Sequence, residues 1–364
     1  MEQRNPALDV VRCFALLCVI SVHFFLNSGF YDEIVSGFPM FVMVLLRNFF
    51  MICVPLFMIL SGYLLNTKKI SRSYFSKIFQ TIGIYLLASL MCAAYRFFFD
   101  RESFSFMGSI WGLFTFSTAT YSWYIEMYIG LFLLIPFLNL IYNHLSSQKH
   151  KKLLLLVLFI LTALPSVLNI WQFLNIQWWI QPSTSPNHDY LVPDFWVEIY
   201  PITFYFIGCY LKEYPLKIKR NVNLLLILLV ALFSGIFNFY RSYGAIFQNG
   251  LWNEYRSLLV TVQSVLVFNY LSMKDYSSIG QRTRKVLSKV SAWSLGAYLC
   301  SWIFDAAFYK ILCRWEPIMV NRILYFPIIV FCVYICSILL SAVINFIYDR
   351  AAKLVSSNNK KLGQ

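Results

Sequence analysis

The chain has 364 residues, of which 59% are hydrophobic and only 13% charged, and its mean hydropathy is +0.64. This balance excludes an ordinary water-soluble fold and indicates a single membrane domain. The net charge of +14 does not indicate a nucleic-acid partner, because the lysine and arginine residues are spread over short loops instead of gathering on one soluble face.

Apolar segments long enough to cross a membrane recur along the chain. About 20 residues cover the ~30 Å of hydrocarbon in a bilayer. We therefore expect an all-α integral membrane protein, a bundle of about ten transmembrane helices, at residues 7–26, 39–64, 78–98, 121–142, 153–171, 194–212, 222–240, 252–272, 289–310 and 322–347. Residues 1–350 form the predicted membrane domain and residues 351–364 a basic cytoplasmic tail. No cleavage site of small residues follows the first segment, so we expect it to be retained.

The distribution of positive charge predicts the topology. Twenty-one lysine and arginine residues fall on the side that holds both termini, against three, Arg101, Arg241 and Arg314, in the opposite loops. By the positive-inside rule, the N- and C-termini are predicted to be cytoplasmic. The long outer segments 97–120 and 172–193 are predicted to fold over the outer mouth as short interfacial pieces.

The nine cysteines do not predict a disulfide framework or a metal site. Seven of them lie inside apolar segments, and none has CxxC or metal-ligand spacing. We interpret them as small core residues, and we expect no metal.

The first helix carries a polar face. His23 follows Arg12 by eleven positions, which at ~100° per residue brings the two within ~20° of each other around the helix and ~16 Å apart along its axis. Asp9 precedes Arg12 by three residues, the spacing of an intrahelical ion pair. Because charges at membrane depth are costly, such residues usually face a cavity and mark function.

The topology places further ionisable residues near the outer end of the bundle. His23, Glu126 and Asp305 are predicted to lie at similar depth, with Arg47 in this layer or slightly below it. Imidazole is the side chain best suited to proton transfer near neutral pH, and a carboxylate can orient it. The sequence therefore predicts a catalytic His23 with Glu126 or Asp305 as its partner.

Three stretches resemble the membrane acyltransferase type 3 family, which consists of polytopic, acyl-CoA-dependent acyltransferases. Residues 7–15 (ALDVVRCFA) followed by His23 are similar to the family's first-helix pattern, and residues 54–65 (VPLFMILSGYLL) to the end of its second helix. The third is Ser122-Trp123-Tyr124-Ile125-Glu126 with Gly130 and Pro136. A weaker fourth match has Ser301 where many members have a histidine. A second departure lies at the entry to the third helix, where the family commonly has two basic residues and this chain has Lys77 alone.

The resemblance implies a membrane-bound O-acyltransferase in the cytoplasmic membrane of a bacterium. Its donor would be cytoplasmic acyl-CoA, most often acetyl-CoA, with no permanently bound cofactor, and its partners a hydroxyl acceptor on a cell-surface or lipid-linked glycan and the membrane lipids. His23 would act as a general base or carry the acyl group transiently. The predicted binding residues are Asp9, Arg12, Arg47, Ser61, Gly62, Lys68, Lys69, Arg72, Lys77, Trp123 and Tyr124.

Most of these binding residues fall into three groups, with the CoA phosphates, the thioester oxygen and the sugar ring as their expected contacts. The cations between positions 68 and 77 would attract the phosphates of CoA. Ser61 and Gly62 either offer donors to the thioester oxygen or serve helix packing, and Trp123 and Tyr124 either stack on a sugar ring or anchor the interface. A flippase or transporter of lipid-linked sugars and a glycan polymerase are the alternative functions, and neither would release CoA.

Overall fold

The computed structural model describes residues 5–101, 104–185 and 187–362, the stretch 355–362 by its backbone alone. The described residues form helices and no named strand, which agrees with the predicted all-α class. The α-helices are α1 (Pro6–Asn27), α2 (Gly37–Phe50), α3 (Cys53–Leu65), α4 (Arg72–Phe75), α5 (Ile78–Phe99), α6 (Phe106–Phe114), α7 (Trp123–His144), α8 (Gln148–Thr162), α9 (Pro165–Leu168), α10 (Ile176–Ile180), α11 (Tyr200–Glu213), α12 (Arg220–Ser242), α13 (Leu258–Ser272), α14 (Gln281–Trp315) and α15 (Phe326–Leu362). Short 3-10 turns are η1 (Phe30–Asp32), η3 (Pro182–Thr184), η4 (Val197–Ile199) and η5 (Met319–Tyr325).

The described residues contain seven helical segments long and apolar enough to cross a membrane. They are Pro6–Asn27, Gly37–Leu65, Arg72–Phe99, Trp123–His144, Arg220–Ser242, Gln281–Trp315 and Met319–Leu354. The other three predicted spans fall on α8, α11 and α13, which have 15, 14 and 15 residues. A helix of that length covers only ~22 Å. The protein is thus a multi-pass membrane protein, and ten crossings remain a prediction.

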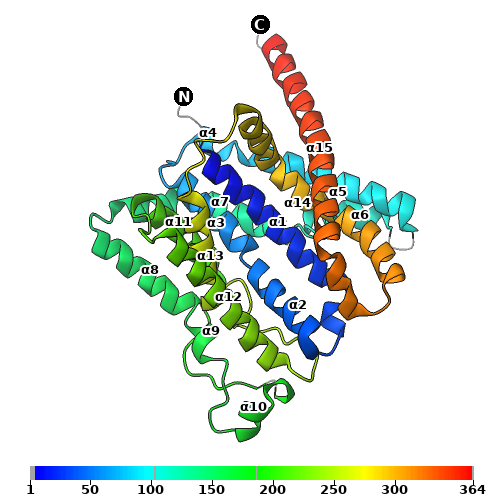
Figure 1. Cartoon of the computed structure of the whole chain (residues 1–364). Helices are drawn as coiled ribbons and strands as arrows, with labels where there is room; N and C mark the ends of the chain where they lie inside the picture. The colour runs from blue at the N-terminus through cyan, green and yellow to red at the C-terminus, as the bar shows by residue number, and fades with distance from the viewer. Residues whose placement is uncertain (1–4, 102–103, 186, 363–364) are drawn as a thin grey trace.

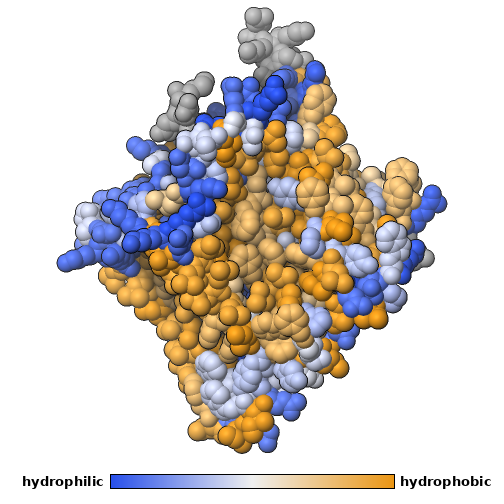
Figure 2. Space-filling view, in the orientation of Figure 1, coloured by the Kyte–Doolittle hydropathy of each residue, from blue (hydrophilic) through white to orange (hydrophobic). Residues whose placement is uncertain are grey.

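The surface of the bundle has the polarity expected for a membrane. Hydrophobic residues cover the middle of the face in Figure 2, and hydrophilic residues gather at the end where α1 begins and the described part of α15 ends (Figure 1). The segments 97–120 and 172–193, which are predicted to lie outside, contain the short helices α6 and α10. α15 runs past position 350 without a break, so the predicted basic tail extends the last helix as far as Leu362.

α1 occupies the centre of the bundle (Figure 1). It packs against α14, α3, α15, α13 and α2, and Val11, Ala15, Leu16 and Ile20 are fully buried along it. A helix surrounded in this way presents most of its faces to protein and few to lipid. Polar residues on α1 therefore lie inside the protein and not against hydrocarbon.

The second predicted span is broken into α2 and α3. The break falls at Met51 and Ile52, one turn before Pro55. Proline has no backbone N–H, so it cannot donate to the carbonyl of residue 51, and its ring clashes with that carbonyl in a continuous helix. The residues that follow belong to α3, which reaches the centre of the bundle.

Glycines allow α3 and α11 to pack in direct backbone contact. A Cβ atom on Gly62 would lie 1.9 Å from the carbonyl oxygen of Tyr205, and one on Gly208 would lie 2.0 Å from that of Ile59. Small residues at such a crossing let helix backbones approach closely in a membrane. Of the two predicted roles of Gly62, the structure favours packing, and the prediction that it binds substrate is corrected accordingly.

Gly62→Ala should therefore destabilise the protein by about 1–3 kcal/mol, because α3 and α11 must separate to admit the methyl group. Thermal unfolding of the detergent-solubilised protein measures this. The matched control is Gly130→Ala in α7, where a Cβ atom meets nothing within 4 Å. Equal melting temperatures for Gly62→Ala and the control would contradict the packing role.

Candidate active site

A cavity of about 230 Å³ runs along α1 inside the bundle. Arg12 and His23 both line it, so the predicted common face of these residues is confirmed. Its other walls come from α3, α5, α7, α14 and the loop before α13. The lining residues that the sequence analysis did not single out include Cys53, Thr81, Tyr128, Tyr255, Ser291 and Tyr298.

α14 follows α1 in the same direction. Ser291 meets Arg12, whose Nη1 donates to its Oγ over 3.3 Å, and Asp305 meets His23. Ser291 and Asp305 lie 14 residues apart, with Tyr298 midway. Positions seven residues apart share a helix face within ~20°, so one face of α14 contacts both Arg12 and His23 on the polar face of α1.

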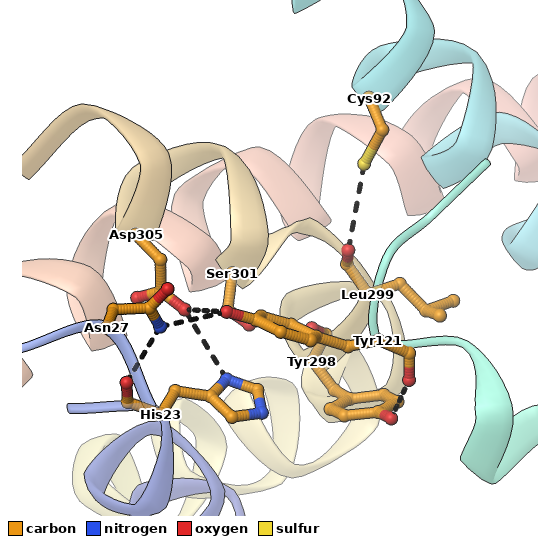
Figure 3. A network of polar contacts seen from close by, with 8 residues as sticks. All are labelled: His23, Asn27, Cys92, Tyr121, Tyr298, Leu299, Ser301 and Asp305. Atoms are coloured by element: carbon orange, nitrogen blue, oxygen red, sulfur yellow. Dashed lines mark hydrogen bonds and ion pairs between the residues drawn. The ribbon is translucent and has the colours of Figure 1, made fainter. Parts of the chain in front are cut away.

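His23 and Asp305 form a buried pair at one end of the cavity (Figure 3). Nδ1 of His23 lies 3.4 Å from Oδ2 of Asp305. The histidine is 8% exposed and the aspartate 1% exposed. Because Nδ1 faces the carboxylate, Nε2 lies on the opposite side of the ring, where it can exchange a proton with a bound molecule.

Tyr121 joins this pair from the loop before α7. Its hydroxyl donates to Oδ2 of Asp305 over 2.9 Å, and its ring lies 3.7 Å from the His23 ring, centroid to centroid, at 33°. Asn27, one turn after His23, donates to the Tyr121 hydroxyl over 3.1 Å. The hydroxyl of Tyr298 donates to the backbone carbonyl of Tyr121. Tyr121 and Asn27 are not among the predicted site residues, although Tyr121 directly precedes the Ser122-Trp123 motif.

The other end of the cavity lies near the predicted basic loop. Thr81, which lines the cavity, follows Lys77 by one helical turn. The predicted cations Lys68, Lys69, Arg72 and Lys77 are all exposed. Asn139 of α7 donates to the carbonyl oxygens of Leu65 and Lys68, 2.8 Å each, which fixes the backbone of this loop. The loop thus presents exposed charged side chains from a backbone that Asn139 holds.

Three further predicted binding residues lie at the cavity. Ser61 lines it, with its hydroxyl donating to the carbonyl oxygen of Phe57 over 2.8 Å. Trp123 is 40% exposed and stacks on Tyr255 at 5.6 Å, and Tyr124 lies beside it. Asp9 is 5% exposed but is not among the residues that line the cavity. Trp123 therefore connects the cavity with the protein surface.

The structure does not place Glu126 at His23. Its side chain is exposed, and it is not among the residues that line the cavity. Tyr124 and Tyr128 of the same helix do line it, and at ~100° per residue Glu126 lies ~160° from each of them. The predicted depth alone therefore did not determine the direction of the side chain, and of the two predicted carboxylates only Asp305 contacts His23.

Arg47 is also placed away from the cavity. Its guanidinium donates to the hydroxyl of Tyr31 (3.0 Å), to the carbonyl of Asn253 (2.9 Å) and to Oδ1 of Asn48 (3.1 Å) and Asn249 (3.0 Å). The guanidinium carbon lies 4.8 Å from the ring centroid of Phe247. These contacts tie α2 to the loop between α12 and α13. The prediction that Arg47 binds substrate is thus corrected to a structural role.

Two weaker features of the sequence also have a place in the structure. Ser301, which stands where many relatives of the resembled family have a histidine, is buried and donates to the carbonyl oxygen of Tyr298 over 2.8 Å. Within the described ranges no three His, Cys, Asp or Glu side chains gather closely enough to hold a metal ion.

Comparison with known proteins gives one match. A family model described as an acyltransferase domain matches residues 5–342, from the start of α1 into α15. This range contains both ends of the cavity. None of the curated proteins and none of the solved structures matches the chain.

Arg47→Met should lower the free energy of unfolding by about 2–4 kcal/mol, because it leaves the buried oxygens of Asn48 and Asn253 without this donor. Arg47→Lys should recover only part of the loss, since a lysine lacks the planar fork. Thermal unfolding in detergent measures both, with Arg314→Met at the exposed end of α14 as the control. A melting temperature for Arg47→Met equal to that of the control would contradict the structural role.

Proposed function

This chain belongs to the membrane acyltransferase type 3 family, and from that premise we propose that it moves an acyl group, acetyl first among the candidates, from cytoplasmic acyl-CoA to a hydroxyl of a cell-surface or lipid-linked glycan. The membrane would be the cytoplasmic membrane of a bacterium. One observation carries the proposal. A single cavity has a cation, Arg12, at one end and the His23–Asp305 pair at the other.

The donor would enter from the end where α1 begins. The exposed cations Lys68, Lys69, Arg72 and Lys77 attract phosphates there, and Arg12 lies just inside. The ~16 Å between Arg12 and His23 suits an extended thioester arm lying along α1. A narrow cavity of about 230 Å³ also favours a small acyl group over a long one.

His23 would be the general base. Asp305 faces Nδ1 and holds the proton there, so Nε2 accepts the proton of the acceptor hydroxyl as its oxygen attacks the thioester carbonyl. The tetrahedral intermediate then expels the thiolate of CoA, which takes the proton from the imidazolium. Asp305 stabilises the positive charge on the ring between these steps.

The acceptor would approach from the side of Trp123. Trp123 and Tyr255 form a stacked aromatic pair that lines the cavity, and Trp123 is partly exposed. Aromatic faces of this kind bind the apolar face of a sugar ring. A glycan hydroxyl placed against this pair would enter the cavity toward His23.

A transporter of lipid-linked sugars and a glycan polymerase are the competing functions, and release of free CoA separates them from the acyltransferase. Purified protein in liposomes would be mixed with acetyl-CoA and with glycolipid extracted from the source membrane. Liquid chromatography then measures CoA, which avoids thiol reagents that would react with the nine free cysteines. CoA release that does not depend on the glycolipid would contradict transfer to a glycan.

His23→Ala should reduce acyl transfer at least a hundredfold, because the proton acceptor is lost. Asp305→Asn should reduce it about tenfold to a hundredfold, because the amide neither orients Nδ1 nor stabilises the imidazolium. Glycan O-acetyl content in cells and CoA release in liposomes measure both variants, with protein levels controlled.

Glu126→Gln is the matched control, a carboxylate at similar predicted depth that points away from the cavity. It should transfer acyl groups at the wild-type rate. Full activity of His23→Ala would reject the proposed base, and a loss in Glu126→Gln as large as in Asp305→Asn would reject the assignment of the two carboxylates.

Replacing Lys68, Lys69, Arg72 and Lys77 together by glutamine should weaken acyl-CoA binding about tenfold, with a smaller effect at high salt. The control replaces the exposed lysines Lys149, Lys152, Lys217 and Lys219, which removes the same charge from loops on the same predicted side. Isothermal titration of the purified proteins measures both. Equal affinities for the two quadruple variants would contradict the donor entrance.

A further inference from the structure

Tyr121 touches both members of the pair that is proposed to carry out the proton transfer. Its hydroxyl donates to Oδ2 of Asp305, and its ring lies against the His23 imidazole at 3.7 Å. Tyr121 is only 5% exposed and is not among the residues that line the cavity. A residue in this place cannot meet a substrate directly, but it can determine the positions of the two groups that do.

Oδ2 of Asp305 is shared between two neighbours. It lies 2.9 Å from the Tyr121 hydroxyl and 3.4 Å from Nδ1 of His23. The other oxygen, Oδ1, has no hydrogen-bond partner among the described residues. The hydrogen bond from Tyr121 therefore fixes the rotation of the carboxylate, and with it the oxygen that faces the imidazole.

The hydroxyl of Tyr121 is itself held in place. Asn27 donates to it over 3.1 Å, and the same amide donates to the backbone carbonyl of His23 over 2.7 Å. With Asn27 donating to the oxygen, the phenolic proton remains available for Asp305. The chain of contacts thus runs from α1 through Asn27 and Tyr121 to Asp305 and back to α1 at His23 (Figure 3).

We propose that Tyr121 is a positioning residue: its hydroxyl holds the Asp305 carboxylate toward Nδ1, and its ring holds the His23 imidazole with Nε2 toward the cavity. This inference rests on the proposed acyl transfer. The ring packing restricts rotation of the imidazole, and the hydroxyl keeps the carboxylate ready for the imidazolium that forms when His23 takes a proton.

The test compares Tyr121→Phe with the wild type in the CoA-release assay. Loss of one charge-assisted hydrogen bond should lower kcat about tenfold and leave the KM for acyl-CoA unchanged, because Tyr121 does not contact the donor. The matched control is Tyr309→Phe. Tyr309 lies one turn after Asp305 and is equally buried, but its hydroxyl has no hydrogen-bond partner in the described part of the chain.

A double-mutant cycle separates positioning from general loss of structure. In an Asp305→Asn background, Tyr121→Phe should have little further effect, because the group through which Tyr121 acts is already lost. The inference would be overturned if the losses in kcat caused by Tyr121→Phe and by Asp305→Asn multiplied in the double mutant. A wild-type kcat for Tyr121→Phe would overturn it as well. Asn27→Leu provides a second variant that keeps the tyrosine, with an expected kcat loss of about threefold; a wild-type kcat for this variant counts against the inference.

Failure of the inference and failure of the proposed function give different results. If the wild-type protein releases no CoA with any glycolipid, the proposed function fails. If the wild type releases CoA and Tyr121→Phe matches it, only the positioning role fails. Melting temperatures of all variants, measured in detergent, must lie near that of the wild type for the kinetic comparison to count as support.

Discussion

The cost of placing a charge inside an apolar bundle determines how the ionisable residues of this protein are arranged. Most buried cations have their donors occupied. Arg47 has four oxygen partners and Arg322 donates to the carbonyl oxygens of Ser28, Glu316 and Pro317. Nε and Nη1 of Arg241 have no hydrogen-bond partner among the described residues, and its guanidinium instead lies between the rings of two tryptophans. Each of these arginines joins segments that are distant in sequence, so its charge stabilises the fold.

The His23–Asp305 pair departs from this pattern. Their closest atoms are 3.4 Å apart, and Oδ1 of the aspartate has no hydrogen-bond partner among the described residues. A full set of hydrogen-bond partners would hold both side chains in one protonation state. General base catalysis instead needs an imidazole that can gain and lose a proton. The incomplete contacts occur where His23 meets the cavity, and this position supports the chemistry that we propose for the pair.

Much of the arrangement could be predicted from periodicity. Arg12 and His23 share a face of α1 because a step of eleven residues makes just over three full turns, and this required no knowledge of the neighbours. Positions of helices along the chain followed from hydropathy in the same way. Glu126 shows the limit of this reasoning, because its depth could be predicted but the face that α7 turns toward the cavity depends on packing. The roles of Arg47 and Gly62 depend on packing in the same way. A cation or a glycine in a membrane helix can serve substrate binding or helix packing, and the neighbouring element decides which.

Tyr121 was beyond prediction for a different reason. It belongs to an irregular loop, in which Phe116 has a positive φ of 53° and Arg96 donates to the carbonyl oxygen of Thr118 over 2.6 Å. No helical period relates a loop residue to the faces of α1 and α14. Moving any of these three elements by one residue would rotate a helix face by ~100° or carry the loop away from the pair. The site therefore depends on the register of α1, α14 and this loop together, and the loop contributes the hydroxyl that neither helix supplies.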